Sequence, residues 1–179
     1  KNKIPFRTMP GILELIGGKA NVTRLREVEI SDLLRRPPTQ INEDLVGNVL
    51  AGKTVLVTGA GGSIGQELCR QIARWAPEKI ILLGHGENSI FETFQVLKEN
   101  YPSLSIITSI ADIRDCSRID QEFSRTKPHV VFHTAAHKHV PLMEVNVEDC
   151  ILNNVLGTQN IINACKKAKT ERLISTHCK

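Results

Sequence analysis

The sequence predicts an α/β domain with a doubly wound parallel sheet, and three observations favour this fold class. From residue 53 onward, short apolar runs alternate with amphipathic helical segments. This alternation is typical of right-handed strand–helix–strand units, whose parallel sheet is covered by helices on both faces. A glycine-rich turn follows the first apolar run, and polar motifs follow the later ones. Because ligands bind beyond the carboxyl ends of parallel strands, a functional site is expected at these turns.

Hydrophobic periodicity gives the elements in order. Apolar strands are expected at residues 54–57, 79–83, 104–110, 129–133 and from 173 onward. Helices are expected at residues 64–76, 89–100, 117–126 and 147–169. The apolar faces that predict the first and last helices consist of Ile64, Leu68, Ile72 and Ala76, and of Ile151, Val155, Ile162 and Cys165. The expected sheet is therefore of the Rossmann type and is truncated after about five strands.

The most informative motif is the segment from Thr58 to Gly65, TGAGGSIG, where the first strand turns into a helix. Its glycine spacing is a variant of the dinucleotide-binding fingerprint, in which the first glycine allows the tight turn and the last lets the helix lie close to the strand. A pyrophosphate would meet bare backbone and the positive end of the helix dipole. The expected cofactor contacts are Gly59, Gly61, Gly62, Ser63, Ile64 and Gly65. The alternative is a glycine-rich turn that binds no ligand.

The choice between NAD and NADP depends on the end of the second strand, where an acidic residue commonly binds the ribose hydroxyls of NAD. That position holds Gly84, and the first carboxylate, Glu87, comes three residues later. Glu87 can contact the ribose or merely cap the following helix. His85 can meet the 2′-phosphate of NADP. The sequence therefore leaves both cofactors open.

Two carboxylates follow the third strand, in Asp112-Ile113-Arg114-Asp115. The Asp112 carboxylate can accept a hydrogen bond from the amino group of adenine while Ile113 covers the ring. Asp115 can also face the site, but we expect it to be the N-cap of the next helix. Asp112 and Ile113 are therefore added to the expected cofactor contacts.

The loop after the fourth strand runs from His133 to Pro141 and reads HTAAHKHVP. The small residues Ala135 and Ala136 let the backbone approach a cofactor. The three histidines of the loop suggest a metal, but no carboxylate lies among them and their spacing does not favour zinc, so no metal site is predicted. Lys138 is expected to face phosphate or sugar oxygens in the polar wall of a substrate cleft.

Composition argues against several classes of protein. The chain has 41% hydrophobic and 23% charged residues, which is ordinary for a globular protein, and no apolar run has the length of a membrane helix. Five cysteines without a C-x-x-C pair favour a reducing cytoplasm. Residues 1–40 hold eight Lys or Arg and four Asp or Glu, and the remainder holds fifteen of each. Because acidic residues are interleaved with these basic ones, a solvated face or a linker is favoured over nucleic-acid binding or membrane contact.

The chain is expected to consist of a connector, residues 1–50, and an NAD(P)-binding domain, residues 51–179. Proline and glycine breakers separate short helical candidates in the connector, at residues 12–16 and 31–35. Asn42 is a plausible cap for a third helix, residues 43–50. The N-terminal extension is therefore expected to be mostly helical, and its short helices must pack on the NAD(P)-binding domain.

Five segments together resemble the extended short-chain dehydrogenase/reductase superfamily: TGAGGSIG, DIRD, HTAAHKHVPLME, NNVLGT and IST. Within it, they are similar to the capsule-type UDP-N-acetylglucosamine 4,6-dehydratases of bacterial polysaccharide biosynthesis. The histidine-rich block and the GENS turn are more specific than the glycines. RTMPGILELIGG and EISDLLRRPP are similar to the connector of membrane-anchored members. The resemblance covers the whole chain, but only about the first half of the catalytic domain of such enzymes.

The resemblance implies redox chemistry with a tightly held nicotinamide, which takes hydride from sugar C4 and returns it to C6 after loss of water. It carries over the glycine turn, Asp112-Ile113 and Ala135-Ala136 as cofactor contacts. It also implies catalytic roles for Lys138 and Thr176, and it places Asn154, in NNVLGT, in a helix that buttresses the site beside the cofactor. The implied partner of the full-length protein is a UDP-N-acetylglucosamine-like nucleotide sugar. A homo-oligomer, and a location at the cytoplasmic face of the inner membrane, are compatible with this family.

The segment after Thr176 departs from the family pattern. The family has Asp and Lys there, whereas this chain has His177 and Cys178. The single tyrosine, Tyr101, lies far from any Y-x-x-x-K arrangement. Because a general acid or base must lie within reach of the proton it moves, the chain as written is expected to be inactive. Two functions stay open: the cofactor-binding part of a UDP-sugar dehydratase (or of an epimerase or reductase), and a non-enzymatic NAD(P)-binding module.

Overall fold

The computed structural model describes residues 7–8, 26–27 and 42–176, and its contacts divide the chain into two units, Lys1–Ile41 and Asn42–Lys179. In the first unit β1 (Arg7–Thr8) pairs antiparallel with β2 (Arg26–Glu27), a pairing that the sequence did not predict. The helical candidates at residues 12–16 and 31–35 lie outside the described residues. The sequence placed a domain boundary after residue 50, and this domain assignment stays a prediction.

The second unit is built on a parallel five-stranded sheet in the order β5-β4-β3-β6-β7. The strands are β3 (Thr54–Thr58), β4 (Lys79–Gly84), β5 (Ser105–Ile110), β6 (Val130–His133) and β7 (Arg172–Ser175). This is the doubly wound order of the Rossmann fold, and the predicted fold class is confirmed. The order reverses between β3 and β6, where Thr58 pairs with His133 at the carboxyl ends of the two strands. A ligand crevice is expected at this switch point.

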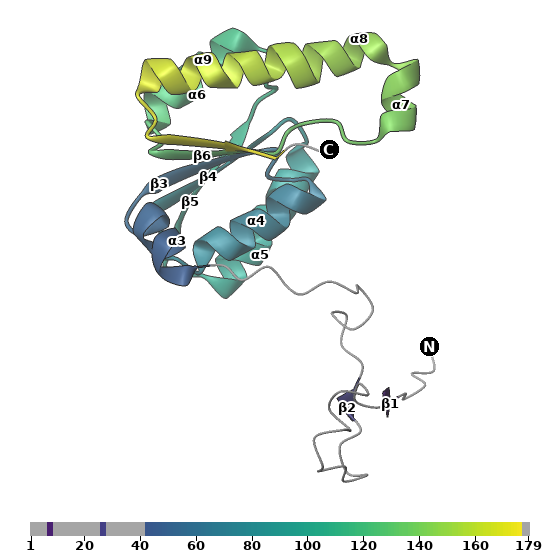
Figure 1. Cartoon of the computed structure of the whole chain (residues 1–179). Helices are drawn as coiled ribbons and strands as arrows, with labels where there is room; N and C mark the ends of the chain where they lie inside the picture. Colours follow the sequence, from purple (N-terminus) through teal and green to yellow (C-terminus); the bar gives the residue numbers. More distant parts are fainter. Residues whose placement is uncertain (1–6, 9–25, 28–41, 177–179) are drawn as a thin grey trace. The chain divides into compact units, whose positions relative to one another are not determined.

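Helices cover both faces of the sheet (Figure 1). One face carries α3 (Glu43–Leu50), α4 (Ser63–Ala73) and α5 (Glu87–Asn100), and the other carries α6 (Cys116–Thr126) and α9 (Thr158–Ala168). Alternate side chains of a strand point to opposite faces, so Val55 and Val57 join the first core and Leu56 the second. All residues of β3 are buried, as expected for the central strand of a sheet covered on both sides.

The connection from β6 to α9 contains three further helical segments: α7 (Val140–Val145), α8 (Val147–Cys150) and the π-helix η2 (Ile151–Gly157). Figure 1 shows α8 and α9 as parts of one long helix, with α7 beyond its start. The long helix predicted over residues 147–169 is thus confirmed in extent. Helix α7 was not predicted: its first two residues were assigned to the loop after the fourth strand, although Pro141 in the first turn is typical of a helix start.

The predicted inward face of the long helix is wrong over its first half. Ile151 and Val155 are 50% and 58% exposed. The buried residues of η2 are instead Asn153 and Gly157. A π-helix has a wider turn than an α-helix, so a reading with α-helical spacing assigns its residues to the wrong face. In α9, Cys165 is buried as expected, whereas Ile162 is only half-buried. The inner positions of this helix are taken by Ile161 and Ala164 together with Cys165.

The predicted face of α4 also needs correction. Ile72 is buried, but Ile64 is 45% exposed and lines a pocket, and Ala76 lies beyond the helix. The close-packed face consists of Gly65, Cys69, Ile72 and Ala73. Cys69 is fully buried, which raises the pKa of its thiol to about 12. Cys69 belongs to the first core, and Cys165 belongs to the second.

Two helix caps follow the sequence prediction. The Asn42 side chain accepts a hydrogen bond of 3.1 Å from the Leu45 backbone N–H at the start of α3. The Asp115 carboxylate accepts one of 3.0 Å from the Arg118 N–H at the start of α6. Each cap satisfies a first-turn donor that has no partner within its helix. Asp115 is therefore an N-cap, as we expected.

Candidate functional site

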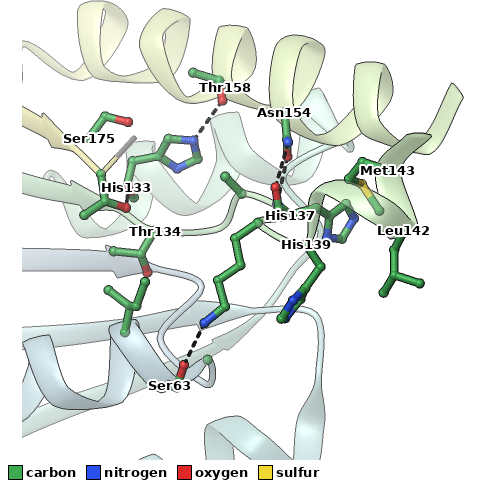
Figure 2. A pocket seen from close by; sticks show the side chains of 16 residues that line it. Ser63, His133, Thr134, His137, His139, Leu142, Met143, Asn154, Thr158 and Ser175 are labelled. Carbon is green, nitrogen blue, oxygen red and sulfur yellow. Dashed lines mark hydrogen bonds between the residues drawn. The ribbon is translucent and has the colours of Figure 1, made fainter. Parts of the chain in front are cut away.

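A pocket of about 510 Å³ lies at the carboxyl ends of β6 and β7 and the start of α4 (Figure 2). Four stretches far apart in the sequence line it: the first turn of α4, the segment from the end of β6 into α7, the helix from η2 into α9, and the end of β7. Its lining includes these predicted site residues: Gly62, Ser63, Ile64, Gly65, Ala136, Lys138, Asn154 and Thr176. The topology thus brings together side chains that the sequence separates by more than 100 positions.

Gly59 and Gly65 are required by the backbone around them. Gly59 has φ +66°, and a Cβ there would lie 2.8 Å from the backbone of Ala135. A Cβ on Gly65 would collide with the Gly59 carbonyl oxygen. These two glycines let β3, α4 and the loop after β6 approach closely, which is the packing role expected of the first and last glycines of the motif.

The middle glycines of the turn differ from each other. A Cβ on Gly61 would collide with the Ser89 side chain of α5. Gly62 is exposed, and a Cβ there would meet only the Gly59 carbonyl oxygen, at 3.3 Å. Gly62 is the N-cap of α4, so the first-turn N–H groups that follow it have no partner within the helix. The space before Gly62 is therefore open to an anion at a helix N-terminus.

The loop after β6 places Lys138 across the pocket from this turn. Lys138 Nζ lies 3.4 Å from Ser63 Oγ. Ala136 lines the same pocket, whereas Ala135 packs against the second core and its backbone against Gly59. The Thr176 N–H donates to the His133 carbonyl oxygen at 3.1 Å, so Thr176 extends the pairing of β7 with β6 to the edge of the pocket.

His133, at the end of β6, is a pocket residue that the sequence analysis did not assign. It is 3% exposed, and its Nδ1 lies 2.7 Å from Thr58 Oγ1. Its Nε2 lies 2.9 Å from Thr158 Oγ1, at the start of α9. The imidazole therefore joins the ends of β3 and β6 to the helix above the pocket. The sequence signal that could have identified His133 is its position at the end of a predicted buried strand.

Two adjacent asparagines of η2 hold the loop after β6. Asn154 Oδ1 accepts from the His137 N–H at 2.8 Å, and Asn154 Nδ2 donates to the His137 carbonyl oxygen at 3.0 Å (Figure 2). Asn153 Nδ2 donates to the Ala135 carbonyl oxygen at 2.8 Å. The amide of Asn154 thus pairs with both backbone groups of the residue before Lys138. Asn153 was not among the predicted site residues. It occupies a buried helical position where an apolar residue is usual.

The remaining predicted contacts lie outside this pocket, at the ends of β4 and β5. Glu87 begins α5 and is exposed. Ile113 is 4% exposed and belongs to the second core, where it would collide with a Cβ on Gly157. Asp112 accepts hydrogen bonds from Arg114 Nε and Nη2 at 2.9 and 2.6 Å. These bonds lower the pKa of the Asp112 carboxyl.

Two further findings concern only the described part of the chain. There, no group of three or more His, Cys, Asp or Glu side chains is arranged to hold a metal ion. No helix among the same residues is long and apolar enough to cross a membrane.

Comparison with known proteins gives a consistent picture. The capsular polysaccharide biosynthesis protein CapD of Staphylococcus aureus is 45% identical over 93% of this chain and 28% of CapD. The inverting UDP-N-acetylglucosamine 4,6-dehydratase of Campylobacter jejuni strain 81-176 is 33% identical over 69% of this chain and 36% of the enzyme. The chain therefore spans 28% and 36% of the length of these curated relatives.

Solved structures share the fold. The NAD complex of UDP-glucose 4-epimerase from Thermus thermophilus matches with a TM-score of 0.55 and 26% identity, over 67% of this chain and 36% of the epimerase. The sequence model described as polysaccharide biosynthesis protein matches residues 55–177, which is most of the chain. The chain therefore belongs to this polysaccharide biosynthesis protein family and is homologous to nucleotide-sugar dehydratases and epimerases of the short-chain dehydrogenase/reductase type.

Proposed function

We propose that the chain is the NAD(P)-binding part of a nucleotide-sugar 4,6-dehydratase that acts on UDP-N-acetylglucosamine in bacterial polysaccharide biosynthesis. The observation that carries this proposal is that the glycine turn, Lys138 and Thr176 line one pocket at the switch point of the sheet. The capsular relative supports the biosynthetic context, and the dehydratase relative supports the reaction and the sugar nucleotide.

The residues of the turn fit a dinucleotide. A pyrophosphate over residues 61–64 would meet an exposed glycine and the first-turn N–H groups of α4. Asp112 and Glu87, at the neighbouring strand ends, are proposed to face the adenosine half. When bound, the nicotinamide would supply the hydride acceptor and donor for the sugar. NADP is as compatible as NAD, because the end of β4 carries Gly84 rather than a carboxylate that would repel a 2′-phosphate.

The other pocket residues bind and orient in this proposal. Lys138 would contact phosphate or sugar oxygens, since its ammonium has three donors and, among the residues that the structure describes, a single recorded contact, to Ser63 at 3.4 Å. Asn154 would keep Lys138 in place through the His137 backbone. Thr176 lies at the pocket edge, where its hydroxyl can bind a sugar oxygen. Ala135 and Ala136 leave room for the nicotinamide half.

We also propose that this chain alone does not turn over the sugar nucleotide. The positions after Thr176, where the family has its acidic and basic residues, hold His177 and Cys178 and lie outside the described residues. Loss of general acid–base help costs roughly 10²–10⁴-fold in rate. A cytoplasmic setting and a homo-oligomer of the full-length protein belong to the same proposal.

The second candidate is an NAD(P)-binding portion of a UDP-sugar epimerase, which the likeness to the epimerase structure favours. A module that binds NAD(P) without catalysis is the remaining alternative. All three share the dinucleotide, and they differ in what happens to the sugar.

Binding of NAD and NADP to the purified chain tests the shared part. Both should raise the melting temperature, with affinities within ~10-fold of each other, a difference below ~1.4 kcal/mol. Gly62→Val should abolish the rise in melting temperature, because the valine side chain would fill the phosphate position. The melting temperature of this variant without ligand should stay close to that of the wild type, which would show that the fold survives. Unchanged affinity in this variant would refute the site.

Incubation with UDP-N-acetylglucosamine and NAD(P) tests the rest. The chain is expected to form no product lighter by one water, as followed by mass spectrometry. A full-length parent protein with Asp and Lys after Thr176 is expected to form this dehydrated product. A C4 epimer from that parent would instead favour the epimerase.

A further inference from the structure

A continuous row of side-chain contacts joins the end of β5 to the loop after β6. Arg114 donates from Nε and Nη2 to the Asp112 carboxylate, and from Nη1 to Asp149 Oδ1 at 2.8 Å. The other carboxylate oxygen, Asp149 Oδ2, lies 2.9 Å from His137 Nε2. One carboxylate on α8 therefore bridges two groups that come from opposite ends of the site.

The residue at the far end of this row is already held through its backbone. Asn154 accepts from the His137 N–H and donates to the His137 carbonyl oxygen (Figure 2). Asp149 adds a contact to the imidazole, from one turn earlier in the same long helix. His137 is thus fixed in both backbone and ring, and it directly precedes Lys138.

This row of contacts contributes little to the stability of the fold. The side chains of Arg114, Asp149 and His137 are 43%, 44% and 37% exposed. Ion pairs this exposed contribute little to stability, because water screens them and the side chains lose entropy. What the row does is fix positions: it connects Asp112, where we place the adenine, with the loop that carries Lys138.

We propose that Asp149 is a positioning residue that transmits occupancy of the adenosine end of the site to the loop carrying Lys138. This inference rests on the proposed function, in which Asp112 faces adenine. An adenine amino group that donates to Asp112 competes with Arg114 for the same carboxylate oxygens. Arg114 then pairs more fully with Asp149, since an arginine fork binds a carboxylate through two parallel bonds. That pairing weakens the contact between the Asp149 carboxylate and His137 Nε2.

Histidine NMR of the whole chain tests this relay. The probe is AMP, which can occupy the adenosine end without reaching the loop. The protein carries ¹³C at the histidine Cε1 position, and the His137 signal is assigned with His137→Gln. In the wild type, saturating AMP is expected to displace the His137 signal. In Asp149→Ala the displacement should be lost, and Asp149→Glu should restore most of it.

The matched control is Glu148→Ala, which removes a neighbouring carboxylate of α8 for which the structure records no ion pair among the described residues. It should behave as the wild type. The melting temperature of Asp149→Ala should stay within ~3 °C of the wild type. Because the loop belongs to the nicotinamide half, Asp149→Ala should weaken NAD at least ~5-fold and AMP less than ~2-fold.

Three results would overturn the relay. The His137 signal could move equally in wild type and Asp149→Ala, which would mean that AMP acts on it directly. It could stay still in a wild type that binds AMP, as reported by the backbone amides of 112–114. NAD and AMP could weaken equally in Asp149→Ala, which would indicate a general structural role. If the wild type bound neither AMP nor NAD, the proposed function itself would fail, and the relay with it.

Discussion

The two sides of the pocket are built differently. The side formed by β3 and α4 is made of backbone: its shape depends on glycines whose added Cβ atoms would meet Ala135 and Gly59. The side formed by the loop after β6 and the long helix above it is made of side chains. Amides from Asn153 and Asn154 and the carboxylate of Asp149 hold that loop.

This difference separates two functions of a site. A backbone-built turn has one geometry and suits a group common to all substrates of a fold, such as a pyrophosphate. A loop held by side-chain amides and charges can be repositioned by changing one residue or by a competing ligand. We therefore expect the first side to be sensitive to added atoms, and the second to be sensitive to changes in donors and charge.

The largest effect is expected at Gly65. Gly65→Ala forces a Cβ into the Gly59 carbonyl and should lower the free energy of unfolding by about 3 kcal/mol. Gly62→Ala, three residues earlier, meets only one atom at 3.3 Å and should stay within ~1 kcal/mol of the wild type. Urea unfolding of the two variants measures both values. Equal losses would show that the turn is not limited by backbone contact.

A smaller effect is expected on the opposite side. Asn154→Asp keeps the acceptor for the His137 N–H but turns a carboxylate oxygen toward the His137 carbonyl, and should cost about 1–2 kcal/mol of unfolding free energy. The control is Asn163→Asp, because within the described part of the chain the Asn163 side chain is recorded only as an acceptor, from Gln159. This change should stay within ~0.5 kcal/mol. Unfolding of Asn154→Asp that matched the control would argue against the clamp.

The smallest effect concerns Asp112 and depends on pH. Arg114 lowers the pKa of this carboxyl in the folded chain below its ordinary value of 3.8. The resulting stabilisation is present above that value and is lost as the pH falls through the lower folded-state pKa. Asp112→Asn should therefore reduce stability by ~1 kcal/mol or less at pH 6 and match the wild type near pH 2. Urea midpoints at the two pH values test this, and a difference that persisted in acid would assign the effect to packing.

Local patterns predicted most of the fold because local physics determines it. The five strands were recognisable as apolar runs, and Asn42 and Asp115 cap helices as isolated sequence rules require. The glycine turn was recognisable for the same reason, since its constraint lies within eight consecutive residues, 58–65. The extent of the long helix after β6 was also predicted correctly.

The side-chain half of the site could not be predicted in this way. Asp149 and Arg114 are 35 positions apart, and Asn154 and His137 are 17 apart. No local periodicity encodes such a contact. The rule that apolar residues face inward also failed in η2, where Ile151 and Val155 are exposed while Asn153 is buried. The inner positions there are used for hydrogen bonds to a loop rather than for packing.

The π-helix has a consequence for the length of the chain between β6 and β7. Each residue of an α-helix advances the rotation by about 100°, so the deletion of one residue from 151–157 would turn α9 by that angle relative to α8. Either the asparagines would leave the loop, or Ile161, Ala164 and Cys165 would leave the sheet. The wider turn of the π-helix lets the asparagines face the loop while the apolar side of α9 still faces the sheet. This segment should therefore tolerate substitutions at its exposed apolar positions far better than the insertion or deletion of one residue.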